Sequence, residues 1–150
     1  MIKEAELSDA SAIYTLVLRH SGAIKEWTRK EIEKIIGNHR DYYVLAAKQG
    51  EEVMGYAFAR FAWGKMHVMD IAVKGEMRGQ GVGKEMMKRL INYAKSQELS
   101  EVYLEVRTNN TLAVRMYQNL SFKTRFILPG LYQGEDGLAM YLSLSPPGKA

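Results

Sequence analysis

Residues 66–84 read MHVMDIAVKGEMRGQGVGK, and this stretch predicts a strand, a glycine-rich turn and a helix in direct succession. Apolar residues dominate 66–73, as expected for a buried strand that ends at a short polar connector. The turn Arg78–Gly83 then leads straight into an amphipathic segment. This order leaves backbone N–H groups without partners at the positive end of a helix dipole, where phosphate and other anions bind.

Two nucleotide-binding motifs can be tested against the glycine-rich turn, and neither fits. A phosphate-cradling nucleotide loop requires Gly five residues before its Gly-Lys pair and Ser or Thr after it, but Arg78 and Glu85 occupy those positions. The dinucleotide fingerprint requires a final Gly where Lys84 stands. The remaining pattern, Arg-x-x-Gly-x-Gly, is compatible with an anion-binding loop and equally with a turn that only caps a helix.

Composition limits the class of protein. The 150 residues, 47% of them hydrophobic, fit one globular domain spanning 1–150. The absence of cysteine excludes disulfides, thiolate metal sites and an acyl-cysteine intermediate. The three histidines lie far apart in sequence and lack metal-ligand spacing, so we expect no metal.

Charge and hydropathy suggest where the chain works. The formal charge of +4 is spread among interleaved acids, which argues against nucleic acid as a partner. No apolar run approaches the length that spans a membrane, and the N-terminal residues lack a secretory hydrophobic region. We therefore expect a cytoplasmic protein without a membrane partner, and a homodimer stays open.

Periodicity and turn residues predict the other elements. Ser8 is expected to cap a first helix that ends at Ser21-Gly22, and Thr28–Glu31 has the pattern of a capping box for a second. Trp27 is interpreted as a hydrophobic staple on that second helix, with a place in an acceptor groove as the alternative. We predict strands at 2–7, 42–47, 53–61, 66–73, 101–107, 122–128 and 138–144, a short helix at 112–120 and a loop at 129–137.

The second half of the chain supplies a family resemblance. The run Leu104-Glu105-Val106-Arg107, followed by Asn110, Ala113, Tyr117, Leu120 and Phe122, resembles the later motifs of the GNAT N-acetyltransferase superfamily. The Arg-x-x-Gly-x-Gly turn is similar to the acyl-CoA pyrophosphate loop of the same enzymes. More narrowly, the run looks like that of protein N-terminal acetyltransferases, including the bacterial ribosomal-protein alanine type. The resemblance extends from about Met66 to Leu144.

The resemblance implies a fold and a cosubstrate. The fold would be α/β (α+β), a mixed, mostly antiparallel sheet of six to seven strands with helices on both faces. Its strands 66–73 and 102–107 would splay apart to admit acetyl-CoA. The backbone of Ile71, Ala72 and Val73 would pair with the pantetheine arm, and the side chain of Asn110 would hydrogen-bond to it. The pyrophosphate would be held by Arg78, Gly79, Gln80, Gly81, Val82 and Gly83.

The same resemblance implies catalytic roles. Glu105 would be the general base that deprotonates the acceptor amine, and Tyr117 the general acid that protonates the departing thiolate. Without the motif, Glu105 could be a solvated carboxylate and Tyr117 a core aromatic. His67 is a weaker third candidate for proton handling.

The acceptor is expected to be the amine of a protein or peptide N-terminus. A polyamine-type small amine is the alternative, and a non-catalytic acetyl-CoA-binding domain is a second one. Two residues depart from the family pattern. Ser121 stands where Gly usually follows the short helix, and Leu131-Tyr132 replaces a tyrosine pair that grips the peptide backbone in many N-terminal acetyltransferases.

Overall fold

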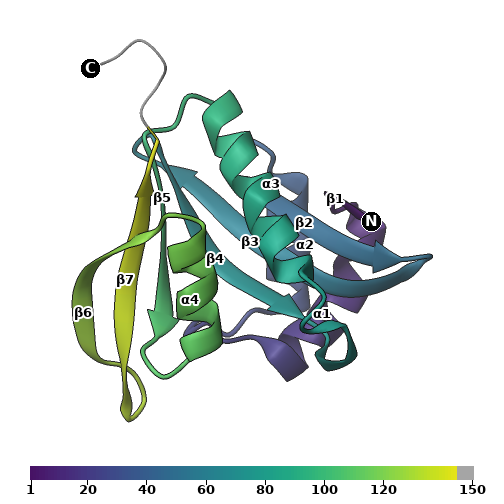
Figure 1. The fold of residues 1–150 in the computed structure, drawn as a ribbon. Helices are drawn as coiled ribbons and strands as arrows, with labels where there is room; N and C mark the ends of the chain where they lie inside the picture. Colours follow the sequence, from purple (N-terminus) through teal and green to yellow (C-terminus); the bar gives the residue numbers. More distant parts are fainter. Residues whose placement is uncertain (145–150) are drawn as a thin grey trace.

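A seven-stranded sheet forms the centre of the computed structural model, which describes residues 1–144 (Figure 1). The strand order is β1-β2-β3-β4-β5-β7-β6, and every neighbouring pair is antiparallel except β4 and β5. This confirms the predicted mixed, mostly antiparallel sheet. The strands are β1 (Ile2–Glu4), β2 (Tyr42–Gln49), β3 (Glu52–Ala62), β4 (Lys65–Val73), β5 (Glu101–Arg107), β6 (Lys123–Tyr132) and β7 (Glu135–Ser143). The helices are α1 (Ala10–His20), α2 (Arg29–Gly37), α3 (Val82–Ser96) and α4 (Thr111–Asn119).

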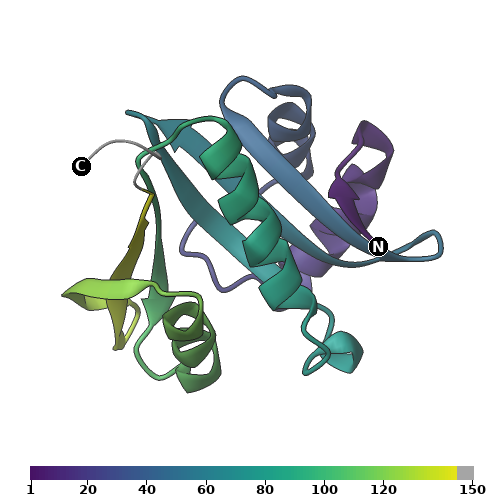
Figure 2. The ribbon, with the colours of Figure 1, turned by 45° about the horizontal axis from the view of Figure 1, so that its top comes forward.

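Helices cover both faces of the sheet, as predicted (Figure 2). On one face α3 packs against the sheet through a buried stripe that includes Met86 and Leu90, and Tyr117 of α4 joins the same core. On the other face α1 and α2 bury Ile13 and Ile32 against β3. The period of about 3.6 residues in these helices places their apolar side chains on one side, and this burial holds the layers together.

The sheet opens between β4 and β5. These strands pair only where Lys65–His67 meets Glu101–Tyr103, and beyond that point they diverge (Figure 1). On its other edge β4 stays paired with β3, but Phe58 and Ala59 pair with Asp70 and Val68, so that Met69 is an extra residue. Such a bulge bends the strand and turns the following side chains to other faces. The splay and the bulge lie side by side in the middle of the sheet.

The start of the first helix differs from the prediction. Ser8 does not cap it: a single 3-10 turn, Leu7–Asp9, comes first, and α1 begins at Ala10. The Asp9 carboxylate accepts a hydrogen bond from the Glu6 N–H at 2.8 Å and pairs with Lys48 Nζ at 2.7 Å. Asp9 is thus engaged with Glu6 and Lys48 at the 3-10 turn that precedes the helix. The Thr28–Glu31 capping box is confirmed, with both of its hydrogen bonds formed.

The predicted loop at 129–137 is wrong. β6 continues to Tyr132 and β7 starts at Glu135, which leaves only a tight turn between them. Pro129 is tolerated because β6 is an edge strand whose register is irregular between Leu128 and Tyr132. The N–H of Gly130 donates to Asp136 Oδ1 at 2.9 Å, which replaces a missing ladder bond.

Candidate active site

A cavity of about 410 Å³ occupies the splay between β4 and β5. Its walls come from both faces of the sheet. Gly22, Ile24 and Trp27 of the α1–α2 loop line it on one face. Gly83 at the start of α3 and Tyr117 of α4 line it on the other. A molecule in this cavity can therefore reach groups on both faces through the gap in the sheet.

The glycine-rich turn forms an open backbone cradle before α3. Gly79 and Gly81 have φ of 78° and 80°, a left-handed conformation that suits glycine. A Cβ built at either position would meet nothing within 4 Å. The turn thus leaves room above the N-terminus of a 15-residue helix, where N–H groups and the dipole favour an anion. This geometry is open to an anion, and of residues 78–83 Gly83 also lines the cavity. The role of 78–83 in holding a pyrophosphate stays a prediction.

Two side chains of the glycine-rich turn form hydrogen bonds within the protein. Arg78 Nε donates to the Val73 carbonyl at 3.3 Å, and its guanidinium lies 3.5 Å from His20 Nδ1. Gln80 Nε2 donates to the Glu76 carbonyl at 3.4 Å. Residues 71–73 line the cavity as predicted, but the Val73 carbonyl already has Arg78 as a partner.

Asn110 lies at the N-terminus of α4 and caps it. Its Oδ1 accepts a hydrogen bond from the Ala113 N–H at 3.3 Å, and the residue lines the cavity. The capping bond occupies the carbonyl side of the amide. The Nδ2 group is therefore the part of Asn110 that remains to donate to a ligand.

Glu105 projects from β5 on the face covered by the α1–α2 loop, and it forms a pair with His67 of β4. His67 Nε2 lies 2.7 Å from Glu105 Oε1. The imidazole ring also stacks on Tyr103, with ring centroids 4.5 Å apart and an angle of 3° between the planes. The short parallel pairing of β4 with β5 brings these residues together although 38 positions separate them in sequence. Sequence reasoning named both residues and missed their contact.

Tyr117 lies on the opposite face from Glu105. Its side chain is 5% exposed, and it lines the cavity from α4. Burial raises the pKa of Tyr117, and the nearby Tyr132 and Asp70 raise it further. The phenol therefore keeps its proton at neutral pH, which a proton donor must do before it can act.

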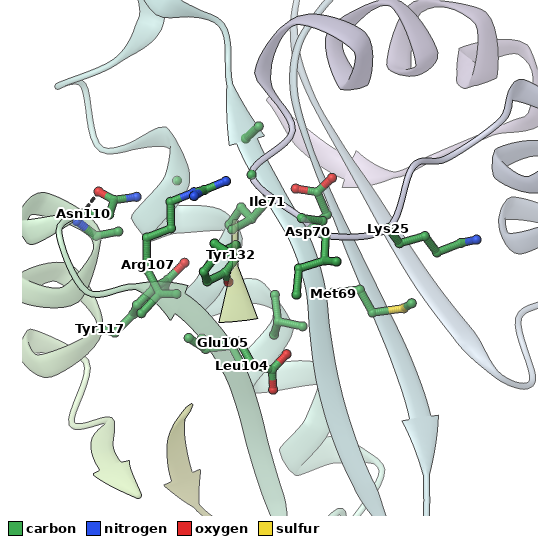
Figure 3. A pocket seen from close by; sticks show the side chains of 18 of the residues that line it. Lys25, Met69, Asp70, Ile71, Leu104, Glu105, Arg107, Asn110, Tyr117 and Tyr132 are labelled. Carbon is green, nitrogen blue, oxygen red and sulfur yellow. Dashed lines mark hydrogen bonds between the residues drawn. The ribbon is translucent and has the colours of Figure 1, made fainter. Parts of the chain in front are cut away.

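Sequence reasoning missed one further residue of the cavity, Asp70, and named another, Tyr132, only as part of a departure from the family pattern. Asp70 on β4 is 6% exposed and faces the α1–α2 loop, and Tyr132 of β6 lies under the Arg107 guanidinium at 4.3 Å from the ring centroid (Figure 3). The sequence signal for Asp70 was that it is the lone acidic residue within the apolar stretch 66–73. Trp27 is buried, packs edge-on against Phe58 of β3 and lines the cavity, and its place in an acceptor groove stays a prediction.

Residues 1–144 hold neither a cluster of metal ligands nor a membrane-spanning helix. No three His, Asp or Glu side chains of this part of the chain converge as metal ligands would. None of its helices is long and apolar enough to cross a membrane.

The comparisons with known proteins agree with this geometry. Residues 9–122 match the acetyltransferase (GNAT) family. The chain belongs to this family. It is similar to an uncharacterised N-acetyltransferase of Methanocaldococcus jannaschii, at 39% identity over 59% of the chain, and to an N-alpha-acetyltransferase of Sulfurisphaera tokodaii, at 34% over 68%. These matches span 58% and 68% of the length of the two GNAT relatives.

A solved GNAT structure confirms the fold over the whole chain. The ribosomal-protein-S18-alanine N-acetyltransferase of Escherichia coli superposes with a TM-score of 0.83 and 22% identity, covering 100% of this chain and 98% of that one. At this identity the likeness concerns the fold. The family match and the fold together confirm the resemblance that the motifs of the second half predicted.

Proposed function

We propose that the chain transfers an acetyl group from acetyl-CoA to a primary amine within a ternary complex. The observation that carries this proposal is the placement of Glu105 and Tyr117 on opposite faces of one cavity that passes through the splay. A base on one side and an acid on the other are what acyl transfer between two bound molecules requires.

Acetyl-CoA supplies the acetyl group as a thioester. Its pyrophosphate would lie in the cradle of Arg78–Gly83, and its pantetheine arm would run along Ile71–Val73, with Asn110 as a donor. The open space at Gly79 and Gly81 and the divergence of β4 from β5 support this placement. The arm would then add to the free edge of β4 as an extra strand does.

Glu105 takes a proton from the acceptor ammonium, because only the neutral amine can attack the thioester carbon. A nitrogen–carbon bond forms and the carbon–sulfur bond breaks. Tyr117 gives its hydroxyl proton to the departing sulfur, so that a thiol leaves. The nitrogen loses a second proton as the amide forms, and a proton returned through solvent restores the Tyr117 hydroxyl. His67 holds the Glu105 carboxylate in place through the 2.7 Å contact.

The acceptor we propose is the N-terminal amine of a protein or peptide. A groove of about 620 Å³ continues from the cavity on the acceptor face, and the two share Ile24, Leu104 and Glu105 as walls. The groove extends to Trp63, which is 96% exposed, and to Phe126. A small polyamine would leave this groove empty, whereas a polypeptide would fill it. The names of the relatives from S. tokodaii and E. coli point the same way.

The test is an acceptor panel read by mass spectrometry, with acetyl-CoA as donor. It contains a dipeptide, a longer peptide with the same first residues, that longer peptide with a blocked α-amine, and a polyamine. We expect acetylation at the α-amine, a higher kcat/KM for the longer peptide, and loss of that advantage in Trp63→Ala. Preference for the polyamine would establish the small-molecule alternative. Acetyl-CoA binding without transfer to any amine would refute the enzymatic proposal.

A further inference from the structure

The buried carboxylate of Asp70 has no part in the proton transfers proposed above. Asp70 is 6% exposed, and its Oδ2 accepts hydrogen bonds from Ser21 Oγ at 2.7 Å and from the Tyr56 hydroxyl at 2.9 Å. Burial raises the pKa of Asp70, while the hydroxyls and backbone amides around it work in the opposite direction. Burying a carboxylate costs free energy unless hydrogen-bond donors compensate. We therefore expect the buried Asp70 to have a structural or functional role.

The two hydroxyls come from different parts of the fold. Tyr56 belongs to β3, the sheet neighbour of β4, and is itself fully buried. Ser21 is the first residue after α1, and its Oγ also accepts a hydrogen bond from the Ala23 N–H at 3.2 Å. The contact of Asp70 with Tyr56 therefore joins two strands that are already paired. The contact with Ser21 joins the sheet to the α1–α2 loop.

The loop that Ser21 begins is a wall of the active-site cavity. Residues 22–25 and Trp27 line the cavity on the acceptor face. At its far end the loop is fixed by the Thr28–Glu31 capping box and by the Lys25–Glu31 ion pair at 2.8 Å. At its near end the hydrogen bonds from Ser21 to Asp70 and from Ala23 to Ser21 provide the anchor.

We propose that Asp70 is a positioning residue that fixes the α1–α2 loop against β4 and so shapes the acceptor side of the cavity. It acts through Ser21, and it does not touch the reacting atoms. The other titratable groups that face it are the phenols of Tyr56, Tyr117 and Tyr132. None of these belongs to the loop, which reaches Asp70 through the Ser21 hydroxyl and through the backbone N–H of Gly22.

Ser21→Ala and Tyr56→Phe form a matched pair of variants. Each removes one hydroxyl donor to the same oxygen, but only the first removes a contact between Asp70 and the loop, where the backbone contact of Gly22 remains. Amide hydrogen exchange of residues 22–27 separates the two effects without any assay of activity. We expect exchange to rise about tenfold or more in Ser21→Ala, as expected for a lost hydrogen bond to a charged group, and to stay near the parental rate in Tyr56→Phe. Equal changes in both variants, or none in Ser21→Ala, would overturn the proposal.

Steady-state kinetics provide the second readout, and this readout alone rests on the proposed acetyltransferase function. Ser21→Ala and Asp70→Asn should raise the KM for the acceptor several-fold and leave the KM for acetyl-CoA unchanged. A parallel rise in both KM values would contradict a role on the acceptor side. If Asp70→Asn fails to fold, Ser21→Ala still decides. A chain without activity would refute the proposed function and leave the exchange result to judge the loop anchor.

Discussion

His67 Nε2 and Glu105 Oε1 lie 2.7 Å apart across the point where β4 and β5 begin to diverge. The two side chains are each about 30% exposed, at 28% and 30%, so the pair borders the cavity without being sealed from water. The stack of His67 on Tyr103 fixes the imidazole plane. Glu105 is therefore held from one side, and its other oxygen is left for an acceptor.

The pair predicts unequal losses of activity for its two members. His67→Phe keeps an aromatic ring against Tyr103 but removes the contact to Glu105, so the base loses orientation and keeps its chemistry. We expect kcat/KM to fall by about 10- to 100-fold, less than for Glu105→Gln. Steady-state rates of both variants with one peptide would measure this. A loss in His67→Phe as large as in Glu105→Gln would make His67 the base.

The glycine cradle can be tested without disturbing the fold. Gly83→Ala adds a methyl group 3.8 Å from Val73 Cγ2, an ordinary contact, on a helix that favours alanine. We expect thermal stability at least equal to that of the parent but weaker binding of CoA, measured by calorimetry, because Gly83 lines the cavity.

Two further variants of the cradle serve as comparisons. Gly81→Val should weaken CoA binding more than Arg78→Ala does, because it blocks approach to the backbone, whereas Arg78→Ala removes one charge. Gly81→Val also carries strain at its φ of 80°, so its stability must be measured as well. Unchanged CoA affinity in all three variants would mean that the turn only caps α3.

We predict that Glu31 makes a pH-dependent contribution to the stability of the fold. Lys25, and then the backbone and side chain of Thr28, lower the pKa of Glu31 to about 2 from 4.5. A carboxyl whose pKa is lower in the folded state stabilises the fold above its unfolded pKa and loses this effect as pH falls through the folded one. Glu31→Gln should therefore lower the melting temperature at neutral pH, and the difference should shrink from about pH 4.5 toward pH 2. Glu33→Gln removes the same charge and serves as the control. A difference in melting temperature between Glu31→Gln and the parent that does not change with pH would contradict a lowered pKa of Glu31.

We predict that replacing Ser121 by glycine stabilises the fold. It follows α4 with a φ of 75°, and the next residue, Phe122, donates its N–H to the Tyr117 carbonyl at 3.0 Å. This helix ending favours glycine, and an L-residue in a left-handed conformation costs roughly 1–2 kcal/mol. Ser121→Gly should raise the melting temperature by about 2–4 °C for each kcal/mol recovered. A melting temperature that stays the same or falls would show that the end of the helix is not strained.

Local patterns predicted much of the fold. The capping box at Thr28–Glu31 and the glycine turn each follow from a few neighbouring residues, and each is found. Ser121, which stands where Gly usually follows the short helix, has the positive φ that glycine favours. The start of α1 was not predicted in this way, and Asp9 beside it pairs with Lys48 from a distant strand. The extension of β6 past Pro129 depends on its place at the edge of the sheet, which sequence does not reveal.

The same distinction between local patterns and long-range contacts applies to the candidate site. The motifs of the second half pointed to Asn110 and Tyr117, and both line the cavity. The contact of His67 with Glu105 depends on the register of two parallel strands, and the burial of Asp70 depends on the bulge at Met69. Both are consequences of long-range pairing. Their catalytic and positioning roles remain predictions.

The pH–rate profiles of Glu105→Gln and Tyr117→Phe, measured with one amine of known pKa, test the division of labour across the cavity most directly. Both variants should lose about 10²- to 10⁴-fold in kcat at neutral pH. Activity of Glu105→Gln should recover as pH rises, because more of the amine is already neutral in solution. Activity of Tyr117→Phe should not recover, because the leaving thiolate still lacks its donor. Near-parental kcat/KM for Glu105→Gln at neutral pH, or the same recovery in both variants, would contradict a base on one face and an acid on the other.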